Sequence, residues 1–581
     1  MMRHGQQARY RRWRMMIVLV FVLPAMASGD QLEIRLDGDF PALRQNVKAF
    51  LGEVEDRNAD RLRRFADQST PEVERALRAL GYYQPDINWE VKKDDPPKLT
   101  LTIKPGKPVR IKTRTVEVRG PAAEDDSFAP IPREWLKVGD VLNHSDYESV
   151  KGTIRNHARR LGYFDGRFTE SRLRVDPEAL AAHITLIYES GQRFRLGDVS
   201  FEEGHGFDED LLRRFVQFES GSRYHADKLA ELNSDLSNSG YFAQVIVDAS
   251  PQDAKDQSIP VVVRLSRRER RSVSAGLGFS TDVGPRVRGT WTEHWINPQG
   301  HRRHLETELA APRQSLSTWY EIPLDPPMTD SLRFTGGYQR EDIEDVESER
   351  VSVGTQWEHG MDNGWKRILS LRWEGERFQI GNNPTEQSSL LLPGVSYSKL
   401  SADSPMDPSR GYRLQVEAVG GNRDLFSDVD VAQLTGLARG LMTVGNGHRF
   451  LARFKAGAVA TNDFSNVPPS LRFFAGGDQS VRGYAYQTLS PEDAAGNEVG
   501  GRYLLVGSFE YQFPLTDTWR LAAFVDEGNA LDDFSDPLAT GVGVGVRWVS
   551  PVGPIRLDVA KGLDDEFGGG FRVHFSMGPE L

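Results

Sequence analysis

Ser272-Val-Ser-Ala-Gly-Leu-Gly-Phe-Ser280 alternates small or polar residues with apolar ones along its whole length. Successive side chains of an extended strand point to opposite faces, so this stretch predicts a strand with one apolar face. The same alternation recurs later in the chain, at residues 413–419, 450–456, 542–548, 555–559 and 571–577. We therefore expect an all-β region that begins near residue 268.

Alternation alone does not distinguish a soluble sandwich from a transmembrane barrel. In a sandwich the apolar face forms the core, whereas in a membrane barrel the apolar face meets lipid and the polar face lines the lumen. The length of the region, an N-terminal export signal and the lack of membrane-helix segments favour the barrel. At about 20 residues per strand with its loop, residues 268–581 allow about 16 strands. The sequence predicts a 16-stranded antiparallel transmembrane β-barrel.

The residues before the barrel contain a repeat. Gly81, Gly162 and Gly240 lie about 80 residues apart, and each follows an amphipathic helical stretch and precedes a tyrosine. Glycine after the last apolar position is a common left-handed helix stop. Two strand-like runs follow each glycine, which predicts three α+β modules of the order β-α-α-β-β. We place the modules at residues 28–107, 108–193 and 194–267, and the barrel at 268–581.

Residues 1–27 have the features of an export signal. Five arginines precede an apolar core at residues 15–23, and Ala25 and Ala27 form a small-x-small cleavage pattern. The alternative is an uncleaved N-terminal anchor, which is disfavoured because no stop-transfer charge cluster follows directly. We expect a mature chain that starts near Ser28 and leaves the bacterial cytoplasm.

Composition and motif searches exclude several functional classes. A formal net charge of −11 argues against sequence-independent nucleic-acid binding. The absence of cysteine removes disulfide frameworks, thiolate metal sites and cysteine nucleophiles. Neither a nucleophile elbow, a His-Glu-x-x-His motif nor a P-loop occurs, and His301-x-x-His304 lacks further ligands nearby. We expect no enzymatic activity, no cofactor, no metal site and no nucleic-acid partner.

One loop motif carries a family resemblance. Arg472-Phe-Phe-Ala-Gly-Gly-Asp-Gln-Ser-Val-Arg-Gly-Tyr484 resembles the Val-Arg-Gly-Tyr/Phe signature of the outer-membrane assembly-factor superfamily, which includes BamA, TamA and two-partner-secretion transporters. The preceding repeats look like the POTRA (polypeptide-transport-associated) domains of that superfamily. Three such modules and a barrel of this length are most similar to its TamA branch. The resemblance implies a bacterial outer-membrane barrel with POTRA domains in the periplasm.

The resemblance also implies a site in the barrel lumen. The family's motif arginine contacts acidic residues on the strands that follow the loop, and the matching positions here are Glu510 and Asp526. Their strand parity places both carboxylates on the lumen face, where a guanidinium can form forked, charge-assisted pairs. The motif consists of Val481, Arg482, Gly483 and Tyr484. The alternative for Arg482 is an exposed position in an extracellular loop, and the second Arg-Gly-Tyr, at residues 410–412, is interpreted as a turn that enters a strand.

The function implied by the resemblance is non-enzymatic. The chain would help to insert or translocate outer-membrane proteins such as autotransporters, together with a TamB-like periplasmic protein anchored in the inner membrane. Unfolded outer-membrane protein clients and outer-membrane lipid are its other expected partners. POTRA edge strands would capture clients by strand addition. The seam between the first and last barrel strands would open toward lipid, because glycine weakens strand pairing. The expected seam residues are Ser274, Gly276, Gly278, Gly570, Phe571 and Phe575.

Three other functions stay open. A two-partner-type secretion pore usually carries two POTRA domains and an N-terminal plug helix, so three modules argue against it. A passive porin would not need the repeats. A component of envelope lipid transport fits the same architecture.

Overall fold

The structure is a computed structural model that describes residues 31–55, 57–92, 94, 96–128, 135–550 and 553–578. The predicted cleavage residues Ala25 and Ala27 lie outside the described residues. The chain forms two compact units. One comprises the residues up to Arg195 together with 223–226, and the other comprises Leu196–Ser222 and the residues from 227 onward. The two units are described separately.

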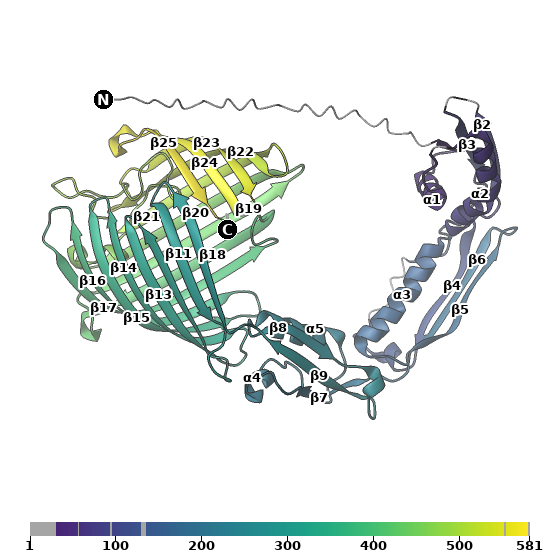
Figure 1. Ribbon diagram of the computed structural model, residues 1–581, viewed down its shortest axis with the longest axis horizontal. Coiled ribbons are helices and arrows are strands. Elements are labelled where there is room, and N and C mark those ends of the chain that lie inside the picture. The colour runs from purple at the N-terminus through teal and green to yellow at the C-terminus, as the bar shows by residue number, and fades with distance from the viewer. Residues whose placement is uncertain are drawn as a thin grey trace, which may run out of the picture. The chain divides into compact units, whose positions relative to one another are not determined.

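The first unit contains two α+β modules (Figure 1). The first module has a sheet of order β1-β3-β2, and its elements are β1 (Leu32–Leu36), α1 (Pro41–Leu51), α2 (Ala59–Ala79), β2 (Asp86–Lys92) and β3 (Lys98–Lys104). The second has the order β4-β6-β5, with β4 (Arg110–Arg119), η1 (Pro121–Glu124), α3 (His144–Leu161), β5 (Arg167–Asp176) and β6 (Ala181–Glu189). Each sheet places one face against its helices, and the apolar residues between them form a separate core in each module.

The predicted glycine stops are confirmed, and one predicted helix is corrected. Gly81, Gly162 and Gly240 have φ values of +90°, +89° and +80°, in the left-handed region that favours glycine. In the second module, the position of the first predicted helix is occupied by η1, a 3-10 helix of four residues, among the residues that the structure describes. The proline and glycine around residues 120–121 permit one tight turn there, but no apolar period continues it into a longer helix.

The second unit begins with the third module. Its sheet has the order β7-β9-β8, and its elements are β7 (Arg195–Phe201), α4 (Glu209–Arg213), α5 (Ala226–Asn238), β8 (Phe242–Asp248) and β9 (Ser258–Arg267). Each predicted module boundary falls between elements, with residues 107 and 193 in the connections before β4 and β7, and residue 267 at the end of β9.

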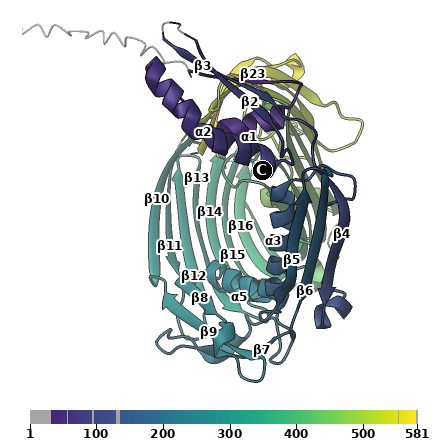
Figure 2. The same cartoon turned by 90° about the vertical axis from the view of Figure 1, so that its right-hand side faces the viewer.

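A single 16-stranded sheet follows, as predicted. Consecutive strands pair antiparallel from β10 to β25, and Figure 2 shows β10 to β16 side by side along one wall. The strands are β10 (Arg271–Ser280), β11 (Gly284–Glu293), β12 (Arg302–Ala310), β13 (Arg313–Pro323), β14 (Asp330–Ile343), β15 (Val346–Gly360), β16 (Lys366–Ile380), β17 (Glu386–Ala402), β18 (Arg410–Gly421), β19 (Val431–Val444), β20 (His448–Thr461), β21 (Tyr503–Pro514), β22 (Trp519–Leu531), β23 (Ala539–Ser550), β24 (Gly553–Gly562) and β25 (Phe571–Met577).

The two faces of this sheet have the polarity of a membrane barrel. Large apolar side chains point outward and are exposed, among them Val273, Leu277, Phe454, Val544 and Leu557. Charged side chains of the opposite face are buried, among them Arg449, Arg547 and Asp558. A soluble sandwich would show the reverse arrangement, so the predicted fold class is confirmed. No helix among the described residues is long and apolar enough to cross a bilayer.

Candidate functional site: the loop arginine and the seam

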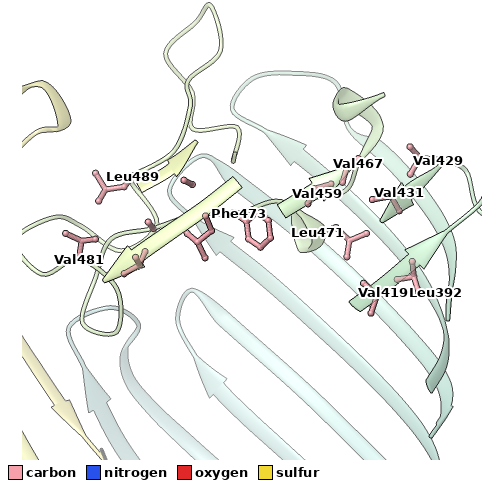
Figure 3. Close-up of a cluster of buried hydrophobic side chains, with 14 of the residues drawn as sticks. Leu392, Val419, Val429, Val431, Val459, Val467, Leu471, Phe473, Val481 and Leu489 are labelled. Atoms are coloured by element: carbon pink, nitrogen blue, oxygen red, sulfur yellow. The ribbon is translucent and has the colours of Figure 1, made fainter. Parts of the chain in front are cut away.

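The long loop between β20 and β21 packs against the barrel wall through apolar side chains (Figure 3). Its buried residues include Leu471, Phe473, Val481 and Leu489. These side chains form one cluster with strand residues, including Leu392 of β17, Val419 of β18, Val431 of β19 and Val459 of β20. Burial of this apolar surface holds the loop in place before any polar contact is considered.

Arg482, at the centre of the motif, lies in a buried pocket of carboxylates. Its Nε and Nη2 donate to the two oxygens of Asp526 at 2.7 and 2.9 Å, which is a bidentate pair. Its Nη1 donates to Glu510 at 2.8 Å and to Asp558 at 3.2 Å. Nη2 also contacts the Ser508 hydroxyl at 3.4 Å. The three side chains that the motif matching places together are therefore in direct contact, and Arg482 is not an exposed loop residue.

Two members of this cluster were not found from the sequence. Arg547 of β23 donates to both oxygens of Glu510, at 2.9 and 2.7 Å, and to Asp558 of β24. The strand alternation already placed Arg547 and Asp558 on the lumen face, but it does not indicate which lumen residues meet. Two arginines thus share three carboxylates (Glu510, Asp526 and Asp558), and all five side chains are buried.

Neighbouring groups fix the position of the arginine. The guanidinium carbon of Arg482 lies 3.3 Å from the centre of the Phe524 ring, which is a cation–π contact. Gly483 has φ +98°, and a Cβ there would lie 2.5 Å from the backbone nitrogen of Gly562. A Cβ on Gly541 would overlap the carbonyl oxygen of Arg482. Glycine at position 483 of the loop and at position 541 of β23 therefore lets the loop backbone approach the barrel wall closely.

The first and last strands lie at the two ends of the sheet order, and no ladder joins them in the described part of the chain. Thr281 and Phe575 make the contacts between these ends: the Thr281 amide donates to the Phe575 carbonyl at 3.1 Å, and the Phe575 amide donates to Thr281 Oγ1 at 3.2 Å. The rings of Phe279 and Phe575 lie 5.6 Å apart. Leu277 is 84% exposed and Phe571 is 78% exposed, so most of the seam is unpacked on its outer face.

The other expected seam residues do not bridge β10 and β25. The Ser274 hydroxyl bonds to that of Thr290 on β11, and a Cβ on Gly276 would meet open space. Gly278 lies against the Arg286 side chain, and the carbonyl of Gly570 accepts from Gly562. These residues flank a weak seam without interlocking across it.

Asp478, in the same loop as the motif, connects the two sides of the seam. Asp478 Oδ1 accepts from Thr281 Oγ1 at 2.7 Å and lies 2.8 Å from Nδ1 of His574 on β25. The Asp478 amide donates to Asp282, and the Gly483 amide donates to His574 Nε2 at 2.9 Å. A backbone amide can only donate, so His574 Nε2 accepts from Gly483. His574 Nδ1 is therefore protonated and donates a hydrogen bond to Asp478.

Asp282, Asp478 and His574 are also the one group of three potential metal ligands among the described residues, with ligand atoms within 4.8 Å of one another. Both ring nitrogens of His574 are already engaged, so the arrangement fits a hydrogen-bonded link better than a metal centre. His301 and His304 have separate neighbours, Tyr320 and Trp319. The second Arg-Gly-Tyr lies at the start of β18, as interpreted from the sequence.

Comparisons with known proteins agree with this architecture. The Omp85 superfamily domain matches residues 302–580, the first POTRA domain of TamA matches 33–105, and the surface antigen variable number repeat, a POTRA family, matches 194–268. The outer membrane protein assembly factor BamA of Nitratidesulfovibrio vulgaris is 23% identical over 430 residues, which cover 70% of this chain and 54% of that protein. BamA of Neorickettsia risticii is 23% identical over 418 residues, which cover 64% of this chain and 53% of that protein.

The chain thus spans about half the length of these relatives. The crystal structure of Haemophilus ducreyi BamA lacking POTRA domains 1–3 has a similar fold, with a TM-score of 0.68 at 15% identity, and the match covers 81% of this chain and 99% of that one. The family matches fall on both sides of the division between modules and barrel, and we conclude that the chain belongs to the Omp85 superfamily, in the group that includes BamA and TamA.

Proposed function

We propose that this chain is a TamA-like assembly factor of the bacterial outer membrane. Its POTRA modules lie in the periplasm, receive unfolded outer-membrane proteins such as autotransporters, and work with a TamB-like partner anchored in the inner membrane. The barrel seam then opens toward lipid and offers its strand edges to the client. No covalent bond of the client is made or broken, so the process depends on the hydrogen bonds of strand pairing.

The observation that carries this proposal is the seam. Every consecutive pair of the sixteen strands has a hydrogen-bonded ladder, whereas β10 and β25 are joined through Thr281 and Phe575. An unpaired strand edge is a template for another strand. Opening here breaks far fewer hydrogen bonds than opening between any other two strands, so this is where a client strand enters at the lowest cost.

The module sheets offer a first point of contact. Each is a three-stranded sheet with two edge strands: β1 and β2, β4 and β5, and β7 and β8. Strand addition at an edge uses backbone hydrogen bonds, so it accepts many client sequences. This supports a receiving role for the modules.

A reversible lock tests the proposal. The chain has no cysteine, so Phe279→Cys with Phe575→Cys creates one thiol on each side of the seam. Neighbouring pairs within 272–280 and 571–577 are scanned for oxidation, which needs Cβ atoms about 3.5–4.5 Å apart. The full chain is reconstituted in lipid vesicles, and folding of an unfolded autotransporter barrel is followed. We expect oxidation to stop client assembly and reductant to restore it.

The matched control is Ser274→Cys with Thr290→Cys. These residues are direct cross-strand partners on β10 and β11, so their disulfide locks a pair that is already closed. The control should assemble clients whether oxidised or reduced. Wild-type client assembly by a fully cross-linked seam would reject lateral opening and favour the secretion-pore alternative. Lipid transfer that stops on locking, while client folding continues, would favour a role in envelope lipid transport.

A further inference from the structure

Three arginines on adjacent strands form a row on the lumen face of the barrel wall, beside the Arg482 cluster. Arg413 of β18 is the direct cross-strand partner of Arg439 on β19, and Arg439 is the direct partner of Arg453 on β20. Like charges directly opposite each other destabilise a strand pair. Three positive side chains in one row therefore require a source of negative charge.

The described residues do not supply it. Arg413 donates to the side chain of Gln415 at 3.3 Å, and Arg453 Nη2 donates to the carbonyl of Ser480 at 2.9 Å. The Nε atoms of Arg439 and Arg453 are buried without a hydrogen-bond partner among the described residues. This is the opposite of Arg482, which contacts three carboxylates in the same lumen.

The nearby carboxylates are already engaged. Asp526 acts electrostatically on Arg453, but both of its oxygens accept hydrogen bonds from Arg482. Glu510 and Asp558 are shared between Arg482 and Arg547. The row beginning at Arg413 is therefore left with uncompensated positive charge.

Arg439 and Arg453 line a cavity of about 50 Å³, together with Arg556 from β24 and the hydroxyl residues Ser508 and Ser576. A cavity of this size holds about four water molecules, and hence one small oxyanion. Arg482 and three carboxylates also line this cavity. Glu510 and Asp558 are paired with Arg482 and Arg547, and Asp478 accepts from Thr281 and His574. Arg439 and Arg453 are partly exposed, so an ion in the aqueous lumen can reach them.

We propose that this cavity is a binding site for a phosphoryl oxyanion, held between Arg439 and Arg453. A tetrahedral dianion offers several acceptor oxygens and enough charge for more than one arginine. Guanidinium groups match that geometry through two parallel hydrogen bonds. The bound anion would neutralise the row and stabilise the Ser480 backbone through Arg453. Free phosphate and the phosphomonoester group of a small molecule or lipid share this chemistry.

Calorimetry and thermal unfolding of the full chain in phosphate-free detergent test the site, with inorganic phosphate as the probe. We expect saturable phosphate binding, competition by sulfate and little effect of chloride. Arg439→Gln and Arg453→Gln should each weaken binding about tenfold or more, because each removes a charge-assisted pair. The matched control is Arg288→Gln, a lumen arginine already bonded to Glu308, and it should bind phosphate as the wild type does.

The sign of the stability change separates this site from a structural role of the arginines. Without phosphate, Arg439→Gln should unfold at the wild-type temperature or higher, since it relieves repulsion between like charges. With phosphate, the wild type should gain thermal stability and the variant should not. If glycerol 3-phosphate competes with phosphate for the site, a small phosphomonoester is sufficient for binding. If phosphatidic acid in mixed micelles competes and glycerol 3-phosphate does not, the ligand is the headgroup of a lipid. Absence of saturable binding, or equal phosphate affinity of wild type and Arg439→Gln, overturns the proposal.

Discussion

Replacing Arg482 by alanine should destabilise the barrel by about 3–5 kcal/mol, the usual cost of removing one partner from a buried ion pair. The side chain makes five hydrogen bonds, and four of them go to carboxylates. Arg547 still pairs with Glu510 and Asp558 in the variant. Asp526 is 0% exposed and loses the guanidinium that neutralises it. Water in the lumen places the expected cost near the lower end, about 3 kcal/mol.

The free energy of unfolding is measured by urea titration of the barrel in lipid vesicles, followed by tryptophan fluorescence and heat-modifiable gel mobility. Client assembly is measured on the same samples. Arg482→Lys keeps the charge but loses the fork, so we expect an intermediate loss. The control Arg288→Ala removes a lumen arginine whose side chain is 53% exposed, and it should cost no more than about 1 kcal/mol.

A double-mutant cycle isolates the pair itself. If Asp526 is destabilising only when unpaired, Arg482→Ala combined with Asp526→Ala should cost less than the sum of the two single changes. Wild-type stability and wild-type client assembly in Arg482→Ala would refute the conclusion that the Arg482 ion pairs stabilise the barrel.

Three other perturbations have defined outcomes. Gly541→Ala should displace the motif loop and raise its protease sensitivity, because the added Cβ overlaps the Arg482 carbonyl, whereas Gly436→Ala meets open space and should behave as the wild type. Burial and the nearby charge of Asp478 raise the pKa of Asp282 to about 7, so the contact between Asp282 and Asp478 should weaken as the pH rises from about 4 through 7. The seam should therefore open faster at pH 8 than at pH 6, and this difference should be lost in Asp282→Asn. An unchanged pH profile in that variant would contradict the assignment. Burial alone would raise the pKa of Asp125, but hydrogen bonds from Ser127 and Tyr163 and the charge of Arg193 hold this pKa well below its usual value. Arg193→Met should therefore increase hydrogen exchange of α3 at pH 7, and the difference from wild type should shrink as Asp125 is protonated in acid. A difference that does not depend on pH would argue against the ion pair.

Much of the architecture follows from local features of the sequence. The period of two in residues 272–280 and its later counterparts predicts strands with an apolar outer face, because lipid and lumen select opposite polarity. Gly81, Gly162 and Gly240 mark helix ends, because only a left-handed residue stops a helix in this way at low cost. Parity on β21 and β22 placed Glu510 and Asp526 on the lumen side, and the resemblance of the loop motif to its family implied that Arg482 contacts them.

Tertiary structure decided which lumen residues meet. Arg547 and Asp558 join the Arg482 cluster, Asp478 connects Thr281 to His574, and Arg413, Arg439 and Arg453 align in one row. Alternation fixes the face of each side chain but not its height in the barrel, since height depends on the register between strands and on the path of the loop between β20 and β21. These are non-local properties. Strand pairing determines the register, and the buried apolar side chains of the loop determine the position of Arg482.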